Sequence, residues 1–133
     1  MSRQPSDAAL DRAFTAMAVG RVIWGVAAYV APRQNARAAG LPGDPSAETV
    51  YLTRVFGSRA FALGCGYLLS GRSARPRLQG LGLVVDAGDT AAGIAELIRG
   101  DVPRRAAGLL TVITGAYAAV GILGVARRFR RGR

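Results

Sequence analysis

The sequence predicts an all-α protein, a bundle of four transmembrane helices with both termini in the cytoplasm. Half of the 133 residues are apolar, and there are 18 glycines. The charged residues gather in short clusters that leave four long apolar runs, and most of the glycines lie inside these runs. Runs of about 20 apolar residues are long enough to cross a bilayer as helices. Residues 1–133 are therefore expected to form one integral membrane domain.

The first two predicted spans are each interrupted by one arginine. Residues 13–31 contain Arg21, and residues 55–71 contain Arg59. Proline 32 predicts the end of the first helix, and Asp44 with Pro45 predicts that the second helix begins about ten residues before its apolar run. The intervening segment, 32–44, is the one connection long enough to fold over a site, and we expect it to be a solvated connector.

The last two predicted spans differ sharply in charge. Residues 78–98 contain Asp86, Asp89 and Glu96, whereas residues 106–126 contain no charged residue. A central Arg or Asp costs roughly 2.5 to 3.5 kcal/mol on insertion scales. The first three spans are therefore expected to depend on one another for insertion.

The glycine content separates this fold from a soluble helical bundle with helices of similar length. Each glycine in the middle of a soluble helix costs about 1 kcal/mol relative to alanine. In a membrane, small residues four apart allow helix backbones to approach closely. Ala60 with Gly64 and Ala62 with Gly66 have this spacing. The glycines therefore favour the membrane bundle.

The orientation follows from the arginine count on each face, because cytoplasmic loops carry the excess of positive charge. One face, with both termini and the second connection, holds ten arginines: Arg3, Arg12, Arg72, Arg75, Arg77, Arg127, Arg128, Arg130, Arg131 and Arg133. The opposite face holds six: Arg33, Arg37, Arg54, Arg99, Arg104 and Arg105. Arginine without lysine is typical of a GC-rich bacterial genome. We expect a multi-pass protein of a bacterial plasma membrane.

The basic segment 127–133 directly follows the fourth span. A cluster in this position fixes topology and lies on anionic lipid headgroups, with about 1 kcal/mol gained per arginine near the surface. Membrane lipids are therefore the expected partners of this tail, and nucleic acid is not.

Several kinds of chemistry are excluded by composition. The chain has no histidine, all 18 of its basic residues are arginine, and Cys65 is its one cysteine. It therefore lacks an imidazole base for a catalytic triad, a lysine for a Schiff base or phosphate loop, and the ligands of a zinc knuckle. We expect neither a cofactor nor a metal site.

Five ionisable residues inside the predicted spans form the candidate site: Arg21, Arg59, Asp86, Asp89 and Glu96. The three carboxylates share one face of their helix, because spacings of three and seven residues return to nearly the same direction. At a rise of 1.5 Å per residue, Arg21 and Asp86 lie about 12 Å from the cytoplasmic edges of their runs. We predict an Arg21–Asp86 ion pair at this depth.

Arg59 lies about 6 Å from the outer edge, between Glu96 at about 3 Å and Asp89 at about 14 Å. We predict that it pairs with Asp89, with Glu96 or with both. Tyr117 of the last span is at the depth of Asp89 and can donate a hydrogen bond to it.

Two interpretations of this cluster are open. In the first, the charges neutralise one another and fix the helix register. In the second, they mark a cavity, an ion path or a catalytic acid, as intramembrane ionisable groups commonly do. The spans hold one carboxylate more than the two arginines can neutralise, which favours a function.

A resemblance to a known family rests on residues 54–64, Arg-Val-Phe-Gly-Ser-Arg-Ala-Phe-Ala-Leu-Gly, followed by Val85-Asp86 in an apolar helix. The chain resembles, over residues 50–126, a family of small four-helix membrane proteins of unknown function from bacteria and fungi. That family usually has Asp after the Arg, where this chain has Ala60. The resemblance implies a fold and no activity, and it selects Arg59 with Asp86 or Asp89.

Three functional classes fit these observations. The first is a binding or transport module for a small molecule or ion, forming a homo-oligomer, in which the Arg/carboxylate cluster lines a polar cavity. The second is an intramembrane enzyme of cyclase, isomerase or epoxide-opening type, with Asp86 or Asp89 as general acid or base. The third is an accessory subunit of a larger membrane complex. Whether the chain is an enzyme stays open.

Overall fold

The computed structural model describes residues 5–131, with side chains described from 7 to 130, and this part of the chain is all-helical. Its five helices are α1 (Pro5–Val30), α2 (Pro32–Ala38), α3 (Ala47–Leu69), α4 (Arg75–Arg99) and α5 (Arg104–Arg131). The expected all-α class is confirmed, and the four apolar runs lie in the four long helices apart from residues 31, 70 and 71. Arg3 and Arg133, two of the arginines in the topology count, lie outside the described residues.

The expected connector 32–44 is wrong in one respect, because it begins with a helix. Pro32 takes one of the first two positions of α2, where its missing N–H costs no hydrogen bond, and both Pro32 and Ala36 are buried. The chain then leaves the helix through Gly40, whose φ of 102° suits glycine.

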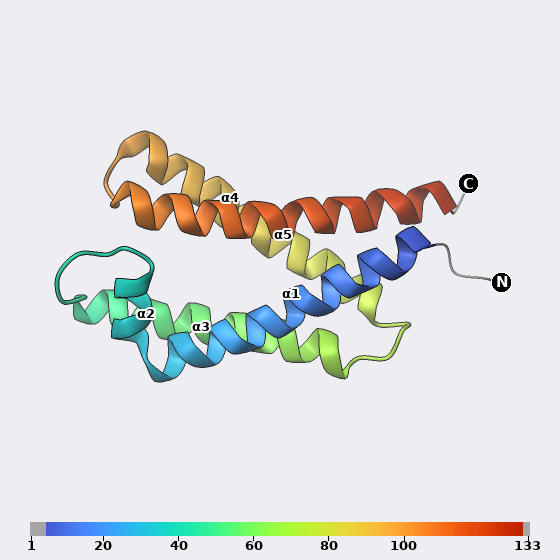
Figure 1. Ribbon diagram of the computed structural model, residues 1–133, viewed down its shortest axis with the longest axis horizontal. Helices are drawn as coiled ribbons and strands as arrows, with labels where there is room; N and C mark the ends of the chain where they lie inside the picture. Colours follow the sequence, from blue (N-terminus) through green and yellow to red (C-terminus); the bar gives the residue numbers. More distant parts are fainter. Residues whose placement is uncertain (1–4, 132–133) are drawn as a thin grey trace.

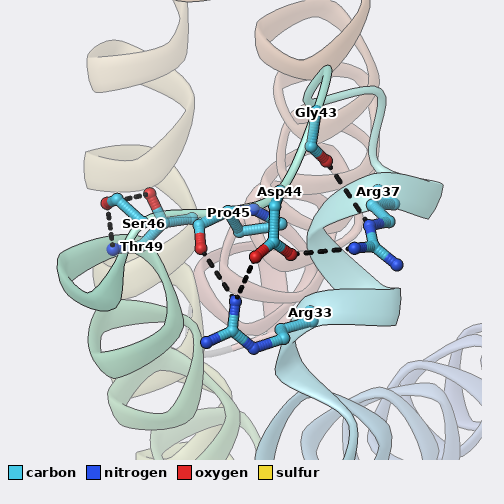
Figure 2. Close-up of polar contacts among 7 residues, drawn as sticks. All are labelled: Arg33, Arg37, Gly43, Asp44, Pro45, Ser46 and Thr49. Carbon is cyan, nitrogen blue, oxygen red and sulfur yellow. Dashed lines mark hydrogen bonds and ion pairs between the residues drawn. The ribbon is translucent and has the colours of Figure 1, made fainter.

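An arginine clasp, formed by Arg33, Arg37 and Asp44, closes the rest of this connector (Figure 2). Arg33 Nη1 donates to Asp44 Oδ2 at 3.0 Å, and Arg37 Nη2 donates to Asp44 Oδ1 at 2.8 Å. The segment is thus held on α2 and does not cover the charged residues of the spans. Ser46, nine residues before Val55, caps α3 by accepting from the Thr49 N–H at 3.2 Å.

The long helices form two hairpins, α1 with α3 and α4 with α5 (Figure 1). Within each hairpin the helices pack along their lengths, whereas α1 with α5 and α3 with α4 touch at few places. The start of α1 and the end of α5 lie at the same end of the molecule (Figure 1). The gap between the hairpins is therefore the weakest part of the packing.

Small residues bring α1 and α3 together. A Cβ added to Gly25 would lie 2.6 Å from the Gly57 carbonyl oxygen, and one added to Gly64 would lie 2.6 Å from the Ala18 carbonyl oxygen. Ala28 and Ala60 complete this seam and are buried. Such backbone contact is typical of helices held together by dispersion in a membrane.

Helices α4 and α5, which hold the third and fourth predicted spans, are separated by the break that the sequence predicts. Pro76 lies in the first turn of α4, and Gly100 ends the helix in the left-handed conformation with φ 79°. The N–H of Gly100 donates to the carbonyl of Glu96 at 2.8 Å. This glycine satisfies a terminal carbonyl and turns the chain toward α5.

Large apolar side chains lie mainly on the outside of the bundle. Among the described residues, the buried apolar side chains are Phe14, Tyr67 and seven alanines. Exposed residues include Ile23, Leu69 and Val112, at 65%, 86% and 70% exposure. By length and composition, two helices are able to cross a membrane, over Asp7–Val30 and Arg104–Arg130.

Candidate functional site

The predicted Arg21–Asp86 ion pair is confirmed. Arg21 Nη2 of α1 donates to Asp86 Oδ2 of α4 at 2.6 Å, with the side chains 12% and 4% exposed. Among the described residues, Asp86 is the one charged residue that is buried. The guanidinium lies over the ring of Tyr117 from α5, 5.0 Å from its centroid, which adds a cation–π contact. Three helices therefore meet at this pair.

The second predicted pair, Arg59 with Asp89, is also present, at 2.6 Å between Nη2 of α3 and Oδ2 of α4. Its side chains are 40% and 33% exposed, so this pair is much less buried than the first. The ring of Phe56, one turn before Arg59, lies 4.9 Å below the guanidinium. Both ion pairs join one hairpin to the other.

Two expectations for the cluster need correction. Glu96 pairs with Arg99 of its own helix at 3.1 Å, so Arg59 does not bridge two carboxylates. The three carboxylates of the third span thus each have one arginine, and the argument from an unneutralised carboxylate fails. Tyr117 lies on the arginine of the first pair, whereas its depth in the sequence allows a hydrogen bond to Asp89.

A small cavity of about 30 Å³ borders the Arg21–Asp86 pair, between the two hairpins. Its polar lining consists of Arg21, Tyr67, Gln79, Asp86 and Tyr117. Its apolar lining includes Phe14. A volume of this size holds roughly one or two water molecules, and these polar groups supply the partners that such water needs.

A wider cavity of about 270 Å³ adjoins the first, and Phe14 and Gln79 line both. Its polar lining comes from the start of α1 and the end of α5: Asp7, Asp11, Arg127 and Arg128, together with Gln79. We call the wide cavity the vestibule. Phe14 and Gln79 are thus shared by the vestibule, at the terminal end of the molecule, and by the small cavity beside Asp86.

Gln79 and Phe14 are site residues that sequence reasoning missed. Gln79 lies seven residues before Asp86 and hence on nearly the same face of α4. A polar side chain on the acidic face of a predicted span was therefore an available signal. Phe14 carried no such signal, because an aromatic residue near a span end is ordinary. The described residues contain no group of three His, Cys, Asp or Glu that could hold a metal.

Comparison with known proteins gives no further identification. No family model matches the chain, no curated protein matches it, and no solved structure matches it. The resemblance of residues 50–126 to small four-helix membrane proteins therefore rests on the residues that carry it.

Proposed function

We propose that the chain is a four-span protein of the plasma membrane with cytoplasmic termini, which binds a proton or small cation at Asp86 and transports it. The observation that carries this proposal is the pair of adjoining cavities that ends at the buried Arg21–Asp86 pair. A transport site needs a polar path from an ionisable group to at least one face. The vestibule shares Phe14 and Gln79 with the cavity beside Asp86, which supports such a path.

The distribution of side chains supports the membrane assignment. A water-soluble bundle buries its large apolar residues and exposes polar ones. Here the interior of the described region is rich in alanine and glycine, while leucine, isoleucine and valine face outward. Lipid is a favourable environment for such a surface, since it places no penalty on exposed apolar side chains.

Helices α1 and α5 have the length and composition of a membrane span, whereas α3 and α4 are not among these candidates. The predicted spans in α3 and α4 hold one and three charged residues. These spans, 55–71 and 78–98, are made acceptable to a bilayer by the pairing of Arg59 with Asp89 and of Arg21 with Asp86. Paired and hydrogen-bonded charges lose less on leaving water than isolated ones. The four spans are thus expected to insert as one unit.

The size of the inner cavity limits the ligand. About 30 Å³ next to Asp86 admits a hydrated proton or a small cation and excludes an organic substrate. An intramembrane enzyme needs a cavity of a few hundred Å³ with an unpaired carboxyl group. Asp86 and Asp89 are both paired with arginine, so the geometry gives the enzyme alternative less support.

The test is proton and Na⁺ flux into liposomes that contain the purified protein, followed with a pH-sensitive and a Na⁺-sensitive dye. We expect flux of one of these ions above that of empty liposomes, and we expect Asp86→Asn to abolish it. Phe14→Ala removes a ring that lines both cavities, so we expect it to increase the flux. Because one variant loses and the other gains flux, misfolding does not mimic the pattern.

Glu96→Gln is the matched control. It removes a carboxylate from the same helix, but Glu96 lines neither cavity, so its flux is expected to equal that of the unmodified protein. Wild-type flux equal to that of empty liposomes would overturn the proposal. A flux that Asp86→Asn and Phe14→Ala both leave unchanged would overturn it as well.

A further inference from the structure

The Arg59–Asp89 pair lies in the middle of its helices yet is only partly covered. Asp89 is 14 residues from the start of α4 and ten from its end, which are about 21 Å and 15 Å along the helix axis. The two side chains are 40% and 33% exposed, against 12% and 4% for Arg21 and Asp86. The exposed part of this pair therefore lies far from both ends of α4.

In a chain that spans a membrane, as the proposed function states, this depth is hydrocarbon. Lipid tails offer no hydrogen bonds, and charged groups in membrane proteins face the protein interior or a water-filled cavity. Arg59 donates one hydrogen bond to Asp89, although a guanidinium has five N–H donors and a carboxylate accepts several bonds. The pair therefore requires a polar covering.

The surface around the pair permits the close approach of another helix. Ala62 follows Arg59 by three residues, and Ala92 follows Asp89 by three, so each alanine lies beside its charged neighbour. Both alanines are exposed, and α3 and α4 touch at few places. We call these four residues the α3–α4 face.

We propose that a second copy of the chain covers the α3–α4 face, forming a two-fold symmetric dimer in the membrane. The argument is charge complementarity: the face carries one positive and one negative group, and a two-fold axis sets two such pairs against each other in opposite directions. Each Arg59 then gains the partner's Asp89 as a second acceptor. A partner of single charge would bring to this neutral pair one charge that has no counter-ion of its own.

Cross-linking in membranes tests this dimer. In a Cys65→Ser background, Ala92→Cys is compared with Ala91→Cys, using an oxidant to form disulfides between copies. Both alanines are exposed on α4. By helix geometry, Ala92 lies about 60° from Asp89 and Ala91 about 160° from it. We expect a disulfide-linked dimer for Ala92→Cys and no disulfide-linked dimer for Ala91→Cys.

The mass in mild detergent is the second readout. The unmodified chain is expected at twice 13.8 kDa. Ala92→Trp should shift it to the monomer, and Ala91→Trp should leave the dimer intact. A cross-link from Ala92→Cys to another protein, equal cross-linking from both positions, or a monomer throughout would overturn the proposal.

Carbonate extraction of the same membranes distinguishes failure of the dimer proposal from failure of the membrane function on which it rests. A monomeric chain that resists extraction would overturn the dimer alone and leave the membrane transport function standing. A chain that carbonate releases would overturn both. Loss of flux in Asp86→Asn with the dimer retained would support the two proposals independently.

Discussion

At the scale of single residues, the two inter-hairpin ion pairs differ in how much protein surrounds them. Asp86 is nearly inaccessible and has Arg21 as its one charged contact, whereas Asp89 and Arg59 retain a third or more of their exposure. Removing one member of a buried pair leaves an uncompensated charge, while removing both leaves none. Single and double substitutions at Arg21 and Asp86 should therefore behave differently.

We predict that Asp86→Leu lowers the free energy of unfolding by about 3 kcal/mol or more, because Arg21 is left buried without its counter-charge. The double variant Arg21→Leu/Asp86→Leu should recover most of this loss. Thermal unfolding in detergent measures both. A double variant as unstable as the single one would mean that the pair itself holds the hairpins together.

Glu48, in the first turn of α3, lies outside the predicted spans and is fully exposed. Hydrogen bonds from the backbone at residue 48 and from the Ser46 hydroxyl hold the pKa of its carboxyl below the ordinary value of 4.5. The ionised form is thus favoured in the folded state. Its contribution to stability is present above pH 4.5 and is lost as the pH falls through the lowered pKa.

We predict that Glu48→Gln makes protein stability depend less on pH in the acidic range where the Glu48 carboxyl titrates. Thermal midpoints of the variant and the unmodified protein should differ at neutral pH and converge in acid. Thr49→Val, which keeps the carboxyl group, serves as the control. Identical pH profiles for Glu48→Gln and the unmodified protein would contradict the stated hydrogen bonding.

The sequence predicts the Arg21–Asp86 pair and includes Asp89 among the possible partners of Arg59, because depth along a helix is set by residue count. It does not predict the partner of Glu96. Arg99 is three residues away on the same helix and reaches Glu96 without any tertiary contact, so it competes with Arg59. The position of Tyr117 depends on the rotation of α5, which residue counting does not fix.

At the scale of helices, the α1–α3 seam has no room for added atoms. Gly64→Ala would place its Cβ 2.6 Å from a backbone oxygen of α1, where no side chain can move aside. We predict a loss of about 1 to 3 kcal/mol from this overpacking, measured by thermal unfolding in detergent.

Gly108→Ala is the matched control, since a Cβ there has no atom within 4 Å. This change should leave stability equal or raise it by up to about 1 kcal/mol, through the better helix propensity of alanine. Equal losses at both positions would show that the seam is looser than the close contacts indicate.

The arginine clasp is the helix-scale feature that the sequence does not predict. Segment 32–44 contains Pro32, Gly40, Pro42 and Gly43, which are typical of a loop, and α2 is only two turns long. A proline followed by alanines and arginines was the sequence feature that could have indicated helix α2. In the sequence, Asp44 with Pro45 predicts the start of the second long helix. In the structure, Asp44 pairs with Arg33 and Arg37.

We predict that Asp44→Ala speeds hydrogen exchange in residues 39–46, because the clasp loses its shared carboxylate. Global stability should change by less than about 1 kcal/mol, since both ion pairs of the clasp are exposed. Mass spectrometry after exchange measures the first effect. An unchanged exchange rate would mean that Gly40 and the buried prolines alone hold this segment.

At the scale of the whole molecule, the sequence predicts four long helices but not how they pair. Loop length favours neighbours in sequence, yet four helices of similar depth allow several arrangements. The packing of α1 on α3 follows from glycines that face each other, and their rotation is a tertiary property. The hairpins meet through two ion pairs and through the apolar cluster of Phe14 and Tyr67 with Leu78 and Val120, which residue counting along the helices does not predict.

Orientation is the whole-molecule prediction. In a Cys65→Ser background, Pro42→Cys in the connector after α2 should react with a membrane-impermeant thiol reagent added to intact cells. Ser73→Cys, in the turn before α4, should react only after the cells are broken. Both positions are exposed. The reverse pattern would mean that the arginine count assigns the faces wrongly.

The placement of small residues inside and large ones outside has a consequence for random variation in this protein. In the membrane protein that we propose, replacing an outward-facing leucine or isoleucine by another apolar residue changes little, because lipid adapts to any shape. Replacing an inward-facing glycine or alanine by anything larger separates two backbones. In a library of single substitutions, stability should therefore fall with the volume of the new side chain at interior positions and with its polarity at exterior positions.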